Sequence, residues 1–161
     1  MDASNPSKQY NLTNSPNSYD SSPSWSPDGT SIVFVSNRDG KDSLYVINIE
    51  SGSLEPLSLG VEFSKSYNIE PSWGPNDKIA FSSDKTGLYK LYVWDKSGIQ
   101  TVNTYASNTD HAPKWSPDGK LLAFVTNFPA GNQRVFVTSV YGTIYASMPA
   151  DLTSTNPTWQ P

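Results

Sequence analysis

The pentapeptide WSPDG occurs twice in the chain, as residues 25–29 and again as residues 115–119. Within Ser-Pro-Asp-Gly, proline presets φ for the second position of a type I turn, aspartate suits the third, and glycine accepts left-handed backbone at the fourth. A turn of this kind followed by a bulge is a common connection between two antiparallel strands. We therefore predict that each copy joins one strand to the next.

A third turn departs from this pattern. Residues 74–77 read GPND, which places Asp77 where the other two turns have glycine. Aspartate tolerates left-handed backbone better than most residues do, at a cost of about 1 kcal/mol. We predict that this turn is the least stable of the three.

A Pro-x-Trp tripeptide sets the register of an internal repeat. Its tryptophans follow one another at steps of 48, 42 and 44 residues, and they are Trp25, Trp73, Trp115 and Trp159. Steps of this size are typical of β-propeller blades. Because a tryptophan recurs at one register in every unit, we interpret it as a packing residue between blades rather than a platform for a ligand. A β-sandwich with accidental internal similarity is disfavoured, since four copies in register are hard to obtain by accident.

Each unit continues with further short apolar runs. The second run reads SIVFVS, KIAFSS or KLLAFVT, the third reads LYVIN, LYVWD or VFVTS, and a weaker fourth follows Gly52, Gly98 or Gly142. Runs this short, rich in β-branched and aromatic residues and bounded by turn residues, indicate strands. Segments such as residues 32–35 are apolar at consecutive positions, which indicates a sheet covered on both faces. A radial stack of four-stranded sheets provides that cover, so we predict an all-β fold of propeller blades.

Composition limits the classes of partner and chemistry. A length of 161 residues fits one domain, and a net charge of -4 with 16% charged residues disfavours nucleic acid. The absence of cysteine excludes disulfides, thiolate metal sites and a cysteine nucleophile. No apolar run reaches the roughly eighteen residues that would span a bilayer, so we expect no membrane insertion and no signal peptide in this sequence.

The motif PxWSPDGxxIxFxS, followed by LYVxD, resembles the repeat of TolB-type β-propellers. It is carried by residues 23–48 and 71–95 and, less faithfully, by 113–139. Similar repeats occur in the TolB propeller of the cell-envelope Tol-Pal system, in propellers that precede serine-peptidase domains, and in sensor or scaffold domains. The resemblance favours a periplasmic or extracellular location, and it is strong for architecture but weak for function.

The resemblance also implies the order of strands, from innermost to outermost, and with it the boundaries. Three full blades are expected at about 23–60, 71–105 and 113–149, within a partial propeller at 9–161. Flanking strands are expected at about 9–13 and 157–160, behind a flexible tail at 1–8.

Propellers with this repeat usually have six or more blades, and three blades cannot close a ring. The outer blades are therefore expected to end in exposed apolar faces, which are association sites. We predict that a second copy completes the ring in a homodimer or other homo-oligomer, or that the remainder of a longer propeller does so.

Short polar residues recur three positions before each repeat proline, at Asp20, Asn68, Asp110 and Ser154. One interpretation is structural, since such side chains cap the turn that leads into an inner strand. The other is a ring of polar groups at the mouth of a central channel, with Glu70 and His111 beside it. The structural role is favoured, and the candidate binding residues are Asp20, Asn68, Glu70, Asp110 and His111.

The sequence carries no catalytic constellation. His111 is the only histidine, which excludes a multi-histidine metal site, and no G-x-S-x-G nucleophile motif is present. We expect no catalytic residue, no metal and no cofactor, and a non-catalytic scaffold that binds a peptide or protein ligand. The alternatives are the propeller part of a larger enzyme, such as a serine peptidase, and a fragment engineered to study propeller assembly.

Overall fold

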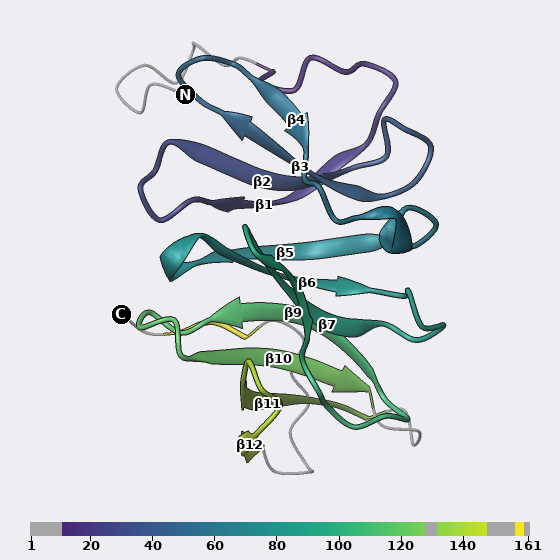
Figure 1. Cartoon of the computed structure of the whole chain (residues 1–161), viewed down its shortest axis with the longest axis vertical. Coiled ribbons are helices and arrows are strands. Elements are labelled where there is room, and N and C mark those ends of the chain that lie inside the picture. Colours follow the sequence, from purple (N-terminus) through teal and green to yellow (C-terminus); the bar gives the residue numbers. More distant parts are fainter. Residues whose placement is uncertain (1–10, 128–131, 148–156, 160–161) are drawn as a thin grey trace.

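The computed structural model describes residues 11–127, 132–147 and 157–159, which contain three four-stranded antiparallel sheets (Figure 1). The first sheet comprises β1 (Asp20–Trp25), β2 (Ser31–Ser36), β3 (Ser43–Asn48) and β4 (Leu54–Pro56). The second comprises β5 (Asn68–Gly74), β6 (Lys78–Ser83), β7 (Lys90–Asp95) and β8 (Gly98–Thr101). The third comprises β9 (Thr109–Trp115), β10 (Leu121–Asn127), β11 (Gln133–Ser139) and β12 (Ile144–Ser147). Two single turns of 3-10 helix, η1 (Val61–Phe63) and η2 (Pro75–Asp77), complete the described elements.

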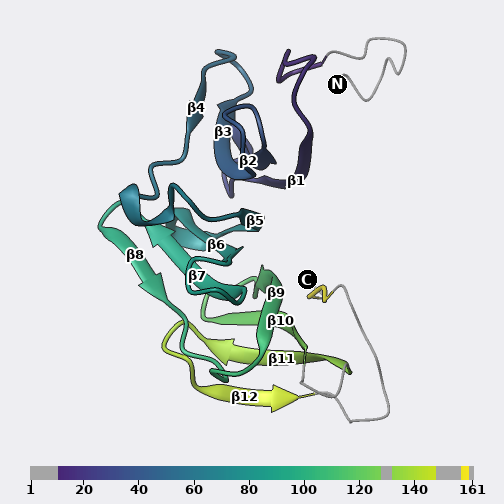
Figure 2. The ribbon, with the colours of Figure 1, turned by 90° about the vertical axis from the view of Figure 1, so that its right-hand side faces the viewer.

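The three sheets are blades stacked face to face, as the repeat predicted. In each sheet the strands lie in sequence order, so the strand that carries Pro-x-Trp is at one edge. Figure 2 shows β1, β5 and β9 on one side of the stack, with β4 and β8 on the opposite side. We call the side formed by β1, β5 and β9 the inner-strand side. The prediction of an all-β fold made of four-stranded propeller blades is confirmed.

Both WSPDG turns connect the first strand of a blade to its second, as predicted. The closing glycines, Gly29 and Gly119, have φ values of 71° and 69°. The Ser26 hydroxyl donates to Asp28 Oδ1 at 2.6 Å and accepts a hydrogen bond from the Ser31 amide at 2.9 Å. The turn in the third blade repeats these two bonds at 2.7 and 2.9 Å. The serine and aspartate therefore hold the turn together through side chains as well as backbone.

The second turn lacks this side-chain bridge, because Gly74 stands where the other turns have serine. Asn76 and Asp77 both adopt left-handed backbone, with φ values of 61° and 56°. A Cβ atom added at Gly74 would lie 2.3 Å from Cδ1 and Cγ of Trp115. Glycine is needed at this position because the Trp115 indole packs directly on the backbone. That this turn is the least stable stays a prediction.

Two apolar cores lie between the blades. The first contains the buried residues Val33, Val35, Leu44, Leu59, Phe63, Ile79, Phe81 and Tyr92. The second contains Ala80, Leu91, Val93, Val102, Trp115, Leu122, Phe124 and Phe136. Successive residues of β6 and β7 enter opposite cores, which explains why these strands are apolar at consecutive positions.

Hydrogen bonds between inner strands join each blade to the next. The Trp73 amide donates to Ser24 Oγ at 2.9 Å, and the Trp115 amide donates to Ser72 Oγ at 3.4 Å. The two serines occupy the same position, the x of Pro-x-Trp. This position therefore contributes a hydroxyl to each of the two joints between blades.

The repeat tryptophans differ in their surroundings. Trp115 is only 8% exposed within the second core, and Trp73 packs against the first. Trp159 donates its indole Nε1–H to the Lys114 carbonyl at 2.9 Å. Trp25, by contrast, is 56% exposed. The predicted packing role therefore describes Trp73 and Trp115, whereas Trp25 has no neighbouring blade among the described residues.

The outer faces of the stack differ from the prediction of open apolar surfaces. On the first blade, Phe34, Tyr45 and Ile47 form a buried cluster of their own. Leu12 and Thr13, which precede β1, line a cavity of about 200 Å³ together with residues of this blade. On β10 of the third blade, Ala123 is also buried, as is Val125. The prediction of exposed apolar faces is wrong for these side chains.

The flanking segments are not strands where the structure describes them. Residues 11–13 form a turn, because the Asn11 side-chain oxygen accepts hydrogen bonds from the Thr13 and Asn14 amides, both at 3.2 Å. Residues 157–159 also lie outside the sheets. The predicted tail at 1–8 and the remaining positions of both flanking segments fall outside the described residues.

Candidate functional site

The five candidate binding residues all lie on innermost strands. Asp20 begins β1, Asn68 and Glu70 belong to β5, and Asp110 and His111 belong to β9. Ser154, the fourth of the polar residues that lie three positions before a repeat proline, falls outside the described residues. The five side chains fall into two groups. Asp20, Asn68 and Asp110 each contact the segment that leads into their own strand, whereas Glu70 and His111 contact each other.

Asn68 is 1% exposed, and its amide group binds the connection that leads into β5. Its Nδ2 donates to the carbonyls of Phe63 and Ser66 at 3.3 and 3.2 Å. Its Oδ1 accepts a hydrogen bond from Ser83 Oγ at 2.8 Å. These hydrogen bonds hold the segment before β5 against the start of β5 and the end of β6.

Asp110 is fully buried and forms an ion pair with Lys90 of β7, whose Nζ lies 3.2 Å from Asp110 Oδ2. Thr104 Oγ1 donates to the same oxygen. Lys90 Nζ also donates to the carbonyls of Tyr105 and Asn108, at 2.6 and 2.5 Å. The Asp110–Lys90 pair thus ties the second blade to the connection that enters the third.

Asp20 is partly buried and faces Arg38, whose Nη2 lies 3.5 Å from both carboxylate oxygens. Ser18 Oγ donates a hydrogen bond to Asp20 Oδ1 at 3.3 Å. Burial alone would raise the pKa of the Asp20 carboxyl, but the nearby hydroxyl groups of Ser36 and Thr13 and the charge of Arg38 together lower that pKa. The carboxylate is therefore already engaged within its own blade.

The same entry positions bind the preceding blade through their backbone. The Asn68 amide donates to the Asp42 carbonyl, and the Asp110 amide donates to the Tyr89 carbonyl, both at 2.9 Å. The recurrence of these polar residues in register thus coincides with a recurring joint between blades.

Glu70 and His111 meet across the joint between the second and third blades. Glu70 Oε2 accepts hydrogen bonds from the Ala112 amide at 2.8 Å and from Ser82 Oγ at 3.0 Å. His111 Nδ1 lies 3.6 Å from the same oxygen. The two side chains are 33% and 23% exposed, so both keep open surface on the inner-strand side.

The Glu70 carboxylate is held in its ionised form. Burial alone would raise its pKa, but the adjacent His111 imidazole and hydrogen bonds from the Ala112 amide and Ser82 outweigh burial and lower the pKa below its ordinary value. The contacts of the carboxylate with described residues all go to Oε2. Oε1 is left to accept hydrogen bonds from another molecule.

A left-handed residue precedes the repeat proline in every blade and shapes this arrangement. Ser22, Glu70 and Ala112 have φ values of 51°, 55° and 49°. The register between the first and second strands of each blade shifts at this point, which marks a β-bulge. In the third blade the bulge presents the Ala112 amide to Glu70. Sequence reasoning missed the bulge, because the restriction on a residue before proline favours extended rather than left-handed backbone.

The contacts around His111 do not form a nucleophile and base. Ser82 is fully buried, and its hydroxyl donates to Glu70 rather than to the imidazole. Among the described residues, no cluster of three or more histidine, cysteine, aspartate or glutamate side chains could hold a metal ion. The geometry of this site suits recognition by hydrogen bonds and charge.

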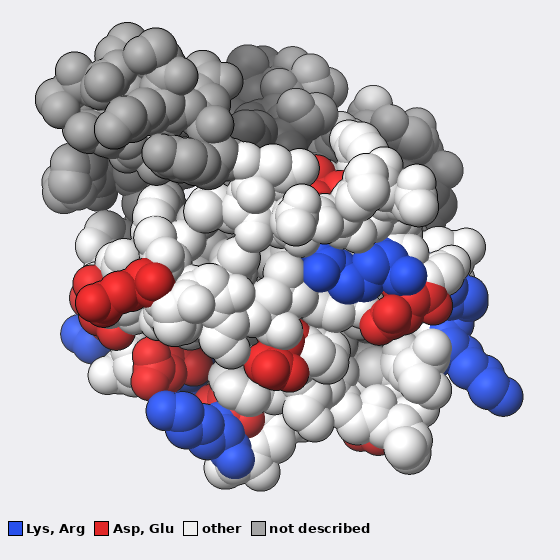
Figure 3. All heavy atoms as spheres, turned by 90° about the horizontal axis from the view of Figure 1, so that it is seen from above, with Lys and Arg blue, Asp and Glu red and all other residues white. Residues whose placement is uncertain are grey.

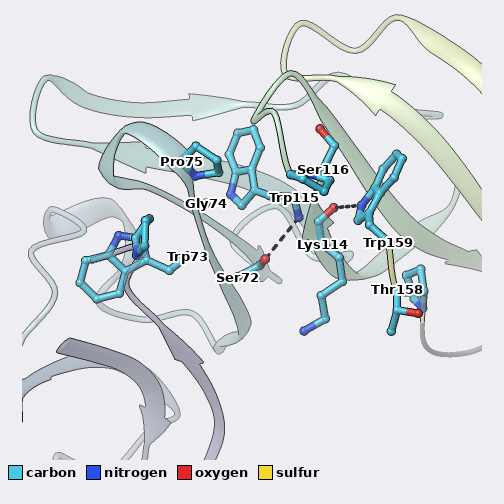
Figure 4. Close-up of a pocket in the computed structure, with 12 residues that line it drawn as sticks. Ser72, Trp73, Gly74, Pro75, Lys114, Trp115, Ser116, Thr158 and Trp159 are labelled. Carbon is cyan, nitrogen blue, oxygen red and sulfur yellow. Dashed lines mark hydrogen bonds between the residues drawn. The ribbon is translucent and has the colours of Figure 1, made fainter. Parts of the chain in front are cut away.

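A second feature lies at the other end of the inner strands, beside the repeat turns (Figure 4). It is a cavity of about 500 Å³, which we call the turn-side slot. Its lining is mostly apolar, with three tryptophans and three turn prolines contributed by successive repeats: Trp73, Trp115, Trp159, Pro27, Pro75 and Pro117. Lys114 is the one charged residue among the described residues that line it.

Charge elsewhere is scattered. Figure 3 shows acidic and basic side chains in small interspersed groups on the face seen from above, with no broad area of one sign. In the described part of the chain, no helix has the length and apolar character needed to cross a membrane.

The family of the chain follows from comparison with known proteins. A family model described as the TolB beta propeller domain matches residues 1–161. The chain belongs to the TolB β-propeller family. This finding confirms the resemblance that the repeat motif carried.

Relatives and solved structures agree with this assignment. A TolB homolog from Chlorobium chlorochromatii is 35% identical over 105 residues, which cover 65% of this chain and 23% of the relative. The Tol-Pal system protein TolB of Francisella tularensis is 26% identical over 138 residues, which cover 81% of this chain and 31% of the relative. The chain thus spans about a quarter to a third of the length of these relatives.

A putative TolB structure from Agrobacterium tumefaciens matches with a TM-score of 0.69 and 25% identity, covering 83% of this chain and 50% of the other. A puromycin hydrolase structure matches with a TM-score of 0.62 and 17% identity, covering 84% of this chain and 22% of the other. The latter likeness is one of fold alone.

Proposed function

We propose that the chain is a non-catalytic binding module that holds a protein segment against its inner-strand side. The observation that carries this proposal is the Glu70–His111 pair, which is partly open and spans two blades. Glu70 supplies an ionised carboxylate whose Oε1 accepts no hydrogen bond from the described residues. A backbone N–H, lysine or arginine of a bound segment would satisfy this oxygen.

The structure of the pair favours binding over turnover. The carboxylate is fixed by the Ala112 amide and the Ser82 hydroxyl, so little side-chain entropy is lost when a ligand donates to it. The His111 and Tyr89 ring centroids lie 5.1 Å apart with the rings tilted by 42°, so the tyrosine packs beside the imidazole. A fixed acceptor next to aromatic surface suits a peptide.

The family supports a protein as the ligand. Relatives carry the name Tol-Pal system protein TolB, and we extend to this chain the expectation of a protein partner and a periplasmic or extracellular location. The peptidase alternative receives less support, because the similarity to puromycin hydrolase concerns the fold only.

Selection of a random peptide library on the immobilised chain tests the proposal. We expect enrichment of a common sequence that contains a basic residue, and we expect the enriched peptides to bind the Glu70→Gln variant more weakly. The Glu55→Gln variant is the matched control, since Glu55 is an exposed acid on the outermost strand β4. Failure to enrich a common sequence, or equal binding to both variants, would refute the proposal.

We also propose that the chain associates with a second copy, and one observation favours it. Trp25 and Trp115 occupy equivalent positions in the repeat, but Trp25 is 56% exposed whereas Trp115 is 8% exposed. A neighbouring blade buries Trp115, so the exposed Trp25 offers a surface that a further blade could cover. The burial of Phe34 and Ile47 leaves less apolar surface for this contact than the sequence implied.

Light scattering at micromolar concentration tests self-association. A dimer that dissociates in the Trp25→Ser variant is expected. A monomer over the whole concentration range would show that Trp25 does not mediate association of the chain.

A further inference from the structure

The turn-side slot contains a lysine at a position where the two preceding blades have serine. The x residues of Pro-x-Trp are Ser24, Ser72 and Lys114 in the three blades. The two serine hydroxyls accept hydrogen bonds from the tryptophan amide of the next blade. A lysine ammonium group has no acceptor and cannot make this bond. The third blade therefore departs from the joint-forming pattern.

The ammonium group of Lys114 has no partner among the described residues. None of their ion pairs or side-chain hydrogen bonds involves its Nζ, although Lys90, Lys96 and Lys120 all form ion pairs. Figure 4 shows the Lys114 side chain extending away from the indole rings of Trp115 and Trp159. A cation that pairs with no described residue thus lies at the border of an apolar cavity.

The slot is large enough for a ligand, and its described lining carries positive but no negative charge. Its volume of about 500 Å³ lies within the range of about 300–1,000 Å³ that is typical of ligand pockets. No aspartate or glutamate belongs to its described lining. Indole and proline rings supply flat apolar surface, and Lys114 supplies the only charge within the described lining. The complementary ligand combines an apolar side chain with a carboxylate.

We propose that the turn-side slot binds a protein segment in which a large apolar side chain is adjacent to a carboxylate. The apolar group lies between the tryptophans, and the carboxylate pairs with Lys114. This inference deepens the proposed function and rests on it, because it assigns a second contact to the same inner-strand side. Glu70 prefers a donor or cation, whereas Lys114 prefers an anion, so the two ends of the inner strands impose opposite charges on a bound segment.

Two small probes that differ only in charge test the proposal with the full chain. N-acetyl-phenylalanine carries a carboxylate beside its aromatic ring, and N-acetyl-phenylalaninamide lacks it. Indole N–H signals in ¹H–¹⁵N spectra report directly on the slot, with assignment by single Trp→Phe variants. We expect the signals of Trp115 and Trp159 to move with both probes and that of Trp94 to stay.

The acid is expected to bind about two- to fivefold more tightly than the amide, as for a partly exposed ion pair. The Lys114→Ser variant, which restores the residue found in the other blades, should bind both probes equally. Lys96→Ser, which removes an exposed lysine outside the slot, should keep the preference for the acid. If Lys114→Ser disturbs the fold, as seen in its circular dichroism spectrum, Lys114→Gln serves in its place.

Equal binding of acid and amide to the wild-type chain would overturn the proposal, as would a preference that survives in Lys114→Ser or unmoved Trp115 and Trp159 signals. These failures are distinguishable from failure of the proposed function. Library peptides whose binding depends on Glu70 would still support a binding module if the slot bound neither probe.

Discussion

The packing of Trp115 on Gly74 makes a specific prediction about stability. In Gly74→Ala, the new Cβ would lie 2.3 Å from two atoms of the indole ring, so the ring or the strand must move. The backbone at this position is extended, with φ of -110° and ψ of 177°, and alanine adopts it without strain. The cost is therefore steric. Overpacking of this kind typically costs about 1–3 kcal/mol, which corresponds to a fall in Tm of roughly 2–12 °C for a chain of this size.

Urea denaturation followed by tryptophan fluorescence measures this cost, and a double-mutant cycle with Trp115→Leu assigns it. Once the indole is gone, Gly74→Ala should change the free energy of unfolding by less than about 0.5 kcal/mol. The single variant should also shift tryptophan emission to the red, because the Trp115 indole is displaced from the second core. An unchanged free energy of unfolding in Gly74→Ala, or the same cost in both backgrounds, would refute the packing described for this joint.

Three further predictions concern the turns and joints. Asp77→Gly should stabilise the chain by up to about 1 kcal/mol, because glycine removes left-handed strain; a lower Tm would contradict this. Glu70→Gln should cost about 1 kcal/mol at pH 7 in urea denaturation. Folding lowers the pKa of Glu70, so the stability difference between the wild-type chain and Glu70→Gln should be fully present above the ordinary glutamate pKa of about 4.3. It should disappear as the pH falls through the pKa of Glu70 in the folded chain. An equal difference at pH 7 and pH 2 would contradict the assignment. Trp25→Phe should change the free energy of unfolding by less than about 0.5 kcal/mol, whereas Trp115→Phe should cost more than 1 kcal/mol; similar losses would contradict their different burial.

The repeat predicted the blades because its information is local. Each turn and each apolar run lies within a few residues of the Pro-x-Trp register, and strand pairing in a blade connects neighbours in sequence. The prediction that WSPDG joins the first and second strands depended only on the conformational preferences of Pro27, Asp28 and Gly29. The same reasoning explains why Asp77 was correctly expected to need left-handed backbone.

The details of the joints between blades could not be predicted in this way. The contact between Glu70 and Ala112 spans 42 residues and depends on a bulge that turns the Ala112 amide toward the second blade. The sequence left two roles open for Asp110, a favoured structural cap and a group at the channel mouth beside His111. Side-chain alternation along β9 buries Asp110 and leaves His111 partly open. That Lys114 pairs with none of the described residues could be seen only once its neighbours in space were known.

The affinity of a library-selected peptide for variants of Glu70 tests the central claim, binding on the inner-strand side, most directly. Isothermal titration calorimetry should show that Glu70→Gln weakens binding about tenfold or more, as expected when a hydrogen bond to a charged group is lost at about 1.5–3 kcal/mol. Glu55→Gln on the outermost strand should leave the dissociation constant unchanged. Equal dissociation constants for the wild-type chain and Glu70→Gln would contradict the account.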